Sequence, residues 1–273
     1  MFPSNIAACL LLALSIGWSS AQNLPSIAEV DLLFPRNDTY APTVLMPLVF
    51  GIQNPSAAVP LHLSLWWNLW QLEGGNMTGY GVIPKAYYIP TGARQYYEYS
   101  SFYDLTTIEG TWLFQWHVDS VNCSQFPANN YSMGSYTQGK RIIFTTKNGA
   151  QAPDLVTATA DDVCASAEGF TFNVTGLEKV SIRSPDNPDG KDSVTTCADV
   201  VPMSPTYRPN PCAAQLNATG ASSISLALTT TACWLPSSVV SCPAKSAGSL
   251  KGQLGGPIWA VATFGWLLYS LVR

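Results

Sequence analysis

Strict two-residue periodicity in two tryptophan-rich stretches is the strongest constraint on the fold. Residues 61–70 read LHLSLWWNLW, and residues 112–118 read WLFQWHV. Alternate side chains of a strand point to opposite faces of its sheet, so each stretch places its apolar residues on one face. The pattern predicts two half-buried β-strands. Their opposite faces would then carry His62, Trp66, Asn68, Trp70, Gln115 and His117.

Several further stretches favour strands over helices. Residues 28–34 and 140–146 alternate, residues 44–52 are continuously apolar, and residues 96–103 are aromatic. Glycine, proline and asparagine clusters separate these stretches too often for long helices. The number and spacing of strands predict a mainly β protein, with an antiparallel immunoglobulin- or fibronectin-like β-sandwich over residues 22–150. The Cys…Trp…Cys core pattern of antibody domains is absent.

The second half of the chain has a different composition. It contains five of the seven cysteines, and we expect residues 151–243 to form a cysteine-rich β module or an extension packed on the sandwich. Residues 170–175 alternate as a strand would. Residues 221–231 read ASSISLALTTT, which fits either a strand or a short helix.

The two termini indicate processing. Residues 6–16 form an apolar run followed by small residues at 19 and 21, which is typical of a signal peptide over residues 1–21. Residues 258–273 end in a hydrophobic stretch of about 15 residues, short for a membrane span of about 20. Small residues and a polar spacer over 244–257 precede it, which is the order of a glycosylphosphatidylinositol (GPI) signal. We expect attachment at Ser246, with Ala247 or Gly248 as alternatives, and a short membrane span as the competing interpretation.

Cysteines and glycosylation sequons agree with secretion. Six cysteines remain after signal removal, which allows three disulfides in 15 connectivities; they are Cys123, Cys164, Cys197, Cys212, Cys233 and Cys242. Six sequons predict surface N-glycans, at Asn37, Asn76, Asn122, Asn130, Asn173 and Asn217. The expected location is extracellular, at the outer face of the plasma membrane or in the cell wall.

The charge balance and the histidine count exclude several functions. The net charge of −4 disfavours nucleic acid as a partner. Only two histidines are available to serve a Ser-His-Asp triad, and no serine lies in a G-x-S-x-G motif. The carboxylates Glu73, Glu98, Asp104, Glu109 and Asp119 lie in no recognisable motif. We therefore expect no enzyme activity, no cofactor and no metal, with an unrecognised secreted hydrolase as an alternative.

The outward faces of the two tryptophan-rich strands carry the most specific chemical hypothesis. If these strands are neighbours, Trp66 and Trp70 would lie beside Asn68, Gln115, His62 and His117. Indoles stack on the apolar face of a sugar ring, and amides bind its hydroxyls. The face could therefore bind carbohydrate. The competing interpretation is that residues 151–242 cover both tryptophans as an interdomain core.

The sequence also resembles a known family. The segment VDLLFPRNDTYAPTVLMPLVFGIQNP, residues 30–55, and the later NPC at 210–212 are similar to a family of fungal secreted proteins, described only as a domain of unknown function. The resemblance implies an extracellular protein that is often GPI-anchored, with no catalytic residues assigned. We therefore expect a non-enzymatic surface glycoprotein, with cell-wall polysaccharide or surface proteins as partners and a lipid anchor in the membrane.

Overall fold

A computed structural model describes residues 23–83, 93–123, 135–182, 193–201, 207–235 and 240–242. The chain divides into two compact units, residues 1–241 and 242–273. Every strand and helix given below belongs to the first unit. The signal peptide and the hydrophobic tail expected from the sequence lie outside the described residues.

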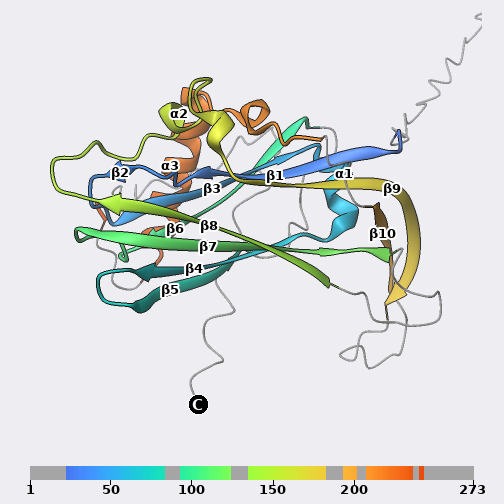
Figure 1. The fold of residues 1–273 in the computed structure, drawn as a ribbon, viewed down its shortest axis with the longest axis horizontal. Helices are drawn as coiled ribbons and strands as arrows, with labels where there is room; N and C mark the ends of the chain where they lie inside the picture. The colour runs from blue at the N-terminus through green and yellow to red at the C-terminus, as the bar shows by residue number, and fades with distance from the viewer. Residues whose placement is uncertain are drawn as a thin grey trace, which may run out of the picture. The chain divides into compact units, whose positions relative to one another are not determined.

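The first of two five-stranded sheets, sheet A, has the order β10-β9-β1-β3-β6 (Figure 1). Its neighbouring strands are antiparallel. Its strands are β1 (Ser26–Phe34), β3 (Leu45–Gln53), β6 (Gln95–Tyr103), β9 (Gly169–Ile182) and β10 (Ser193–Val201). The N-terminal strand β1 therefore lies in the middle, between β3 and the much later β9. Both of its edges are therefore paired, and residues 28–34 are buried.

The second sheet, sheet B, has the order β2-β8-β7-β4-β5. Its strands are β2 (Thr39–Tyr40), β4 (Ser64–Gln71), β5 (Asn76–Ile83), β7 (Gly110–Val121) and β8 (Ser135–Thr146). The two tryptophan-rich stretches become β4 and β7, which pair directly as antiparallel neighbours. The predicted alternation is confirmed, because Leu65, Trp67 and Leu69 are buried while Trp66 and Trp70 are only half-buried.

Aromatic side chains from both sheets form the core between them. Phe102 of β6 contacts Phe114 and Trp67 of sheet B, with ring centroids 5.2 and 5.0 Å apart. Phe50 of β3 lies 5.1 Å from Trp116 of β7. Rings of this size bury large apolar areas, and tilted or edge-to-face packing is the favoured arrangement at these distances. The mainly β architecture with two sheets is confirmed.

The helices are α1 (Pro55–Ala58), η1 (Val59–Leu61), α2 (Leu155–Ala158), η3 (Cys164–Ser166), η4 (Pro211–Ala214) and α3 (Ala218–Ala232). Strands of sheet A contact α1, η1, α2, η4 and α3, whereas η3 contacts η4. Helix α3 and η4 contact β3, and a Cβ on Gly51 would lie 2.8 Å from the Ala214 Cβ. Glycine at this position therefore lets η4 pack directly on the strand. Residues 221–231, for which the sequence predicted either a strand or a short helix, are helical.

The expected boundary at residue 150 does not separate two modules. Strands β9 and β10 complete sheet A, so residues 22–150 and 151–243 share one sheet. The physical reason is that β1 is apolar on the inner face and needs a partner on each side, which residues 169–182 supply. The alternation that predicted a strand at 170–175 was correct, but its partner is in the first half.

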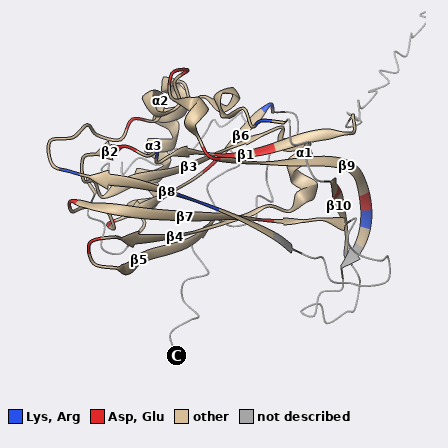
Figure 2. Ribbon diagram, viewed as in Figure 1, with Lys and Arg blue, Asp and Glu red and all other residues tan. Residues whose placement is uncertain are grey.

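Disulfides connect distant parts of this unit. Cys123, after β7, bonds to Cys197 of β10, and Cys164 of η3 bonds to Cys212 of η4. Cys233 and Cys242 are also disulfide-bonded. All six cysteines expected to form disulfides therefore do so. Charged side chains are sparse over both sheets, except for a short acidic stretch in β1, a basic one in β8 and neighbouring acidic and basic positions in β9 (Figure 2).

Candidate ligand-binding face

The strand register of sheet B places twelve side chains in three rows on the surface that faces away from sheet A. We call this surface the outer face. The first row is Val82, Trp66, His117 and Gly139; the second is Tyr80, Asn68, Gln115 and Arg141; the third is Met77, Trp70, Leu113 and Ile143. Within each row, the residues come from β5, β4, β7 and β8 in that order. The register thus confirms that the strands of Trp66 and His117 are neighbours.

The first row is held by a stacked pair. The rings of Trp66 and His117 lie parallel, with centroids 3.6 Å apart and an interplanar angle of 5°. Trp66 Nε1 donates to Asp119 Oδ1 at 3.3 Å, and Thr137 Oγ1 donates to the same oxygen at 2.6 Å. Partial burial lowers the pKa of His117, which favours the neutral ring. One face of the Trp66 indole is therefore already occupied.

Glycine at position 139 makes room for this pair. A Cβ there would lie 2.6 Å from two atoms of the His117 ring. The imidazole therefore lies directly over the backbone of β8, with the indole on its other side. This arrangement gives Trp66 a supporting role on the outer face, rather than that of a free stacking surface.

The second row is polar, and the fold does not use the amide and guanidinium groups of its side chains. Among the residues that the structure describes, the side chains of Asn68, Gln115 and Arg141 make no hydrogen bond to protein. Two carboxamides can each donate and accept, and the guanidinium donates in a planar fork. The row therefore presents hydrogen-bonding groups to solvent that nothing in the described part of the chain satisfies.

The third row and the β5 edge supply apolar surface. Met77, Tyr80, Val82 and Ile143 are between 44 and 74% exposed. Trp70 is half-buried, and neither it nor Tyr80 contacts another aromatic ring within the described segments. Contiguous exposed apolar side chains of this kind mark interaction sites. Trp70 and Tyr80 are the aromatic groups best placed to contact a ligand.

The outer face extends into a groove. Leu113, Arg141 and Ile143 of the outer face also line a groove of about 1000 Å³, together with Arg36 and Asp154 from the other side. Trp66 and Trp70 are four residues apart on β4, which separates them by about 13 Å at the usual strand rise. The surface is therefore longer than one sugar ring, and an extended ligand can span it.

Two expectations about this face are wrong. His62 is not on it, because β4 begins only at Ser64 and His62 adopts a left-handed conformation after η1. Its Nε2 lies 2.9 Å from the carbonyl oxygen of Thr196 on β10. The alternative in which residues 151–242 cover Trp66 and Trp70 is also not observed, because α2, η4 and α3 of that region contact sheet A.

The sequons have different surroundings. Asn37, Asn76 and Asn217 are exposed, and Asn173 is half-buried on β9. The Asn217 Oδ1 caps α3 by accepting from Gly220 N at 2.8 Å, which leaves its nitrogen for a glycan. Asn122 is 8% exposed, and its amide donates to Val200 O at 2.9 Å. A glycan on Asn122 does not fit this packing. Asn130 and Ser246 lie outside the described residues.

Sequence reasoning missed one acidic pair. Glu29 and Asp31 point to the same face of β1, and they are only 3 and 0% exposed. The sequence carried a signal for this pair, because Glu29 and Asp31 occupy alternate positions in a predicted strand whose other residues are apolar. Glu29 lines a cavity of about 610 Å³, but Asp31 does not. A glycosidase needs both carboxyl groups at the substrate, so this pair does not form such a site.

The described residues contain no group of three or more His, Cys, Asp or Glu side chains that could hold a metal ion. None of the helices within these residues is long and apolar enough to cross a membrane.

Comparison with protein families gives one match. A family model for DUF7136, a domain of unknown function, matches residues 23–242. The chain belongs to the DUF7136 family. No curated protein and no solved structure matches the chain. The expectation of a family without an assigned function is confirmed, and membership brings no activity to the outer face.

The residues that carried the sequence resemblance are structural in this DUF7136 protein. Phe34 is fully buried and lies 4.9 Å from the ring of Tyr40. Arg36 donates to Val163 O at 2.7 Å and to Ser166 Oγ at 2.8 Å, which connects the end of β1 to η3. The motif therefore builds a corner of the DUF7136 fold.

Proposed function

We propose that this DUF7136 protein is a secreted surface glycoprotein that binds polysaccharide through the outer face of sheet B and has no catalytic role. The observation that carries the proposal is the second row. Asn68, Gln115 and Arg141 present unsatisfied polar groups between aromatic and apolar rows. Sugars combine apolar ring faces with hydroxyl groups, so this alternation complements a chain of pyranose units.

The chemistry of each row defines its part in binding. Trp70, with Met77 and Leu113 beside it, offers an apolar surface on which a sugar ring can lie. The carboxamides of Asn68 and Gln115 exchange hydrogen bonds with hydroxyls, and Arg141 donates to ring or hydroxyl oxygens. Trp66 is fixed by His117 and Asp119, so it orders the surface before the ligand arrives. A preformed surface loses little conformational entropy on binding.

The protein's cellular location and its type of β-sandwich are also part of this proposal. Three disulfides are typical of proteins folded in an oxidising compartment, which supports secretion. Exposed Asn37, Asn76 and Asn217 support N-glycosylation. We include the GPI anchor at Ser246 and a fungal cell surface as part of the proposal. Adjacent antiparallel β4, β7 and β8, opposite a second sheet, support comparison with immunoglobulin- or fibronectin-like sandwiches.

Replacing Trp70 by alanine is expected to weaken polysaccharide binding about tenfold, because a lost contact of about 1.4 kcal/mol corresponds to that factor. The measurement is a depletion isotherm with insoluble glucans and chitin. Trp234→Ala is the matched control, since Trp234 is 79% exposed and lies after α3. Equal loss in both variants, or no retention of the wild-type protein on any polysaccharide, would contradict the proposal.

Treatment of cells with phosphatidylinositol-specific phospholipase C tests the anchor. Release of the protein into the medium is expected, because cleavage removes the lipid that holds it. A Ser246→Leu variant with Ala247 and Gly248 also replaced by leucine removes the small residues required for attachment. Protein that stays membrane-bound after the enzyme and is unaffected by the replacements indicates a membrane span instead.

A further inference from the structure

The buried carboxyl groups of Glu29 and Asp31 share a single amide nitrogen. Gln53 Nε2 lies 3.1 Å from Glu29 Oε1 and 2.8 Å from Asp31 Oδ2. Burial raises the pKa of Asp31, and the charge of Glu29 also acts on Asp31 and raises its pKa. Asp31 Oδ1 is buried without any partner. Two negative charges this close in a buried site repel strongly, so one proton must be retained between them.

The same pair holds a short segment over the outer surface of sheet A. We call residues 207–212 the strap. Asn210 N donates to Glu29 Oε1 at 2.6 Å, and Tyr207 donates its hydroxyl to Glu29 Oε2 at 3.4 Å. Gln53 Nε2 also lies 2.8 Å from the Asn210 carbonyl oxygen. At its far end, the strap is joined covalently to η3 through Cys212 and Cys164.

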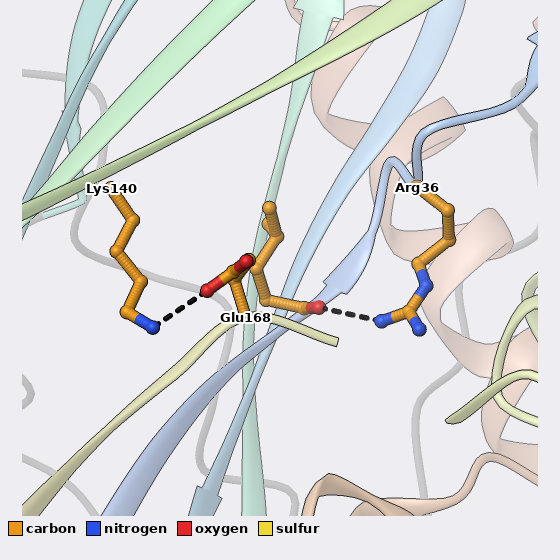
Figure 3. Close-up of polar contacts among 4 residues, drawn as sticks. Arg36, Lys140 and Glu168 are labelled. Atoms are coloured by element: carbon orange, nitrogen blue, oxygen red, sulfur yellow. Dashed lines mark hydrogen bonds and ion pairs between the residues drawn. The ribbon is translucent and has the colours of Figure 1, made fainter. Parts of the chain in front are cut away.

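The cations near the pair do not offset its burial, because the pKa of Asp31 remains raised. Lys140 of β8 acts to lower this pKa, and it forms an ion pair with Glu168 at 2.6 Å. Arg36 also interacts electrostatically with Asp31. Arg36 donates to the Leu32 carbonyl at 3.3 Å; Figure 3 shows it with Lys140 and Glu168. Arg94 lines the neighbouring cavity. On the strap itself, Tyr207 donates to Glu29, and Arg208 is the charged residue of this segment.

We propose that Glu29 and Asp31 form a proton-dependent latch that closes the strap on sheet A. The latch is closed while the pair holds one proton. Loss of that proton leaves two adjacent anions in a buried site, and releasing the strap admits water that screens their charges. Opening then gives solvent and ligands wider access to Glu29 at the floor of its cavity. This device is independent of the polysaccharide-binding proposal, because it lies on the other sheet.

The direction of the pH effect follows from the protons bound in each state. Burial, followed by the charge of Glu29, raises the pKa of Asp31 to about 8 from its ordinary value of 3.8. Between these values, the closed strap keeps a proton that the open strap releases. Opening is therefore favoured as the pH rises through this window, and the closed state is most populated at the acidic end.

Hydrogen exchange at the Asn210 amide tests the latch in the folded, full-length protein. After correction for the intrinsic rate, protection is expected to fall about tenfold per pH unit between pH 5 and 8, because opening releases one proton. Asp31→Asn keeps an acceptor for Gln53 and can donate to Glu29. In this variant, protection of the Asn210 amide should therefore not vary with pH. Constant protection in the wild type, or an unchanged slope in this variant, would overturn the proposal.

Two controls separate the latch from general effects. Asp199→Asn neutralises another carboxylate with a buried, unpartnered oxygen in sheet A, and it should leave the pH slope intact. The Trp116 amide of β7 reports global unfolding and should stay protected throughout. If Asp31→Asn does not fold, Glu29→Gln is the second variant that removes one negative charge from the pair. An unchanged slope of Asn210 protection against pH in that variant would also overturn the proposal.

Discussion

Replacing Cys123 and Cys197 together by alanine is expected to lower the free energy of unfolding by about 4 kcal/mol. Their disulfide joins positions 74 residues apart, and cross-linking so long a segment removes much of the entropy of the unfolded chain. The bond also connects the end of β7 in sheet B to β10 at the edge of sheet A. Its loss should therefore weaken the association of the two sheets at this end.

Urea denaturation of the disulfide variant at constant pH measures the effect. The slope of free energy against urea should increase, because the uncross-linked unfolded chain exposes more surface. That increase separates the entropic effect from lost packing of two buried side chains. A loss of stability below about 1 kcal/mol, with an unchanged slope, would mean that the bond constrains little.

Replacing Phe102 by alanine is expected to cost about 3–5 kcal/mol, as for other large buried aromatic residues. Phe102 is fully buried, and its ring contacts Trp67 and Phe114 of the opposite sheet and lies 6.0 Å from Phe144. Truncation would leave a cavity at the point where three strands of sheet B meet β6. Thermal and urea unfolding both report this loss.

Tyr99→Ala provides the matched control on the same strand. Tyr99 pairs with Val49 of β3 and is 39% exposed, and its side chain lies on the face of sheet A opposite to that of Phe102. Its truncation should cost less than about 1 kcal/mol, as is usual for surface positions. Equal losses for the two variants would contradict the assignment of Phe102 to the centre of the core.

Local periodicity predicted the strands well because it reports which side chains face the core. Trp112 and Trp116 alternate with Leu113 and Gln115, and the structure buries the first two while leaving the others half-buried. His62 has the same alternation in sequence, yet the chain turns there into a left-handed conformation. Periodicity does not detect such a turn, so the first three residues of the pattern, 61–63, were assigned to a strand that starts only at Ser64.

The helix α3 shows a second limit of local reasoning. Its threonines are β-branched and favour strands, which kept both alternatives open. In the structure, Thr229, Thr230 and Thr231 each donate their hydroxyl to the carbonyl oxygen four residues earlier. The helix is selected by burial of Ile224 and Leu228 in the common core. Tertiary packing therefore decides a segment whose own preferences are balanced.

The candidate site was recognisable only in part for the same reason. Pairing of β4 with β7 could be expected from two matched patterns, so Trp66, Asn68, Gln115 and His117 were brought together correctly. Tyr80 was missed because no strand was predicted at β5. Arg141 was missed because its strand was predicted but the pairing of that strand with β7 was not. The acidic pair was missed because its partners, Asn210 and Tyr207, are distant in sequence.

The position of β1 in the middle of sheet A has a consequence for biosynthesis. One edge of β1 can pair with β3 soon after it is made, but the other waits for β9. At about 5–20 residues per second, the ribosome needs roughly ten to thirty seconds to supply that partner. An unpaired strand edge is a template for wrong pairing with other chains. One edge of β1 therefore stays without its native partner until translation has passed residue 182.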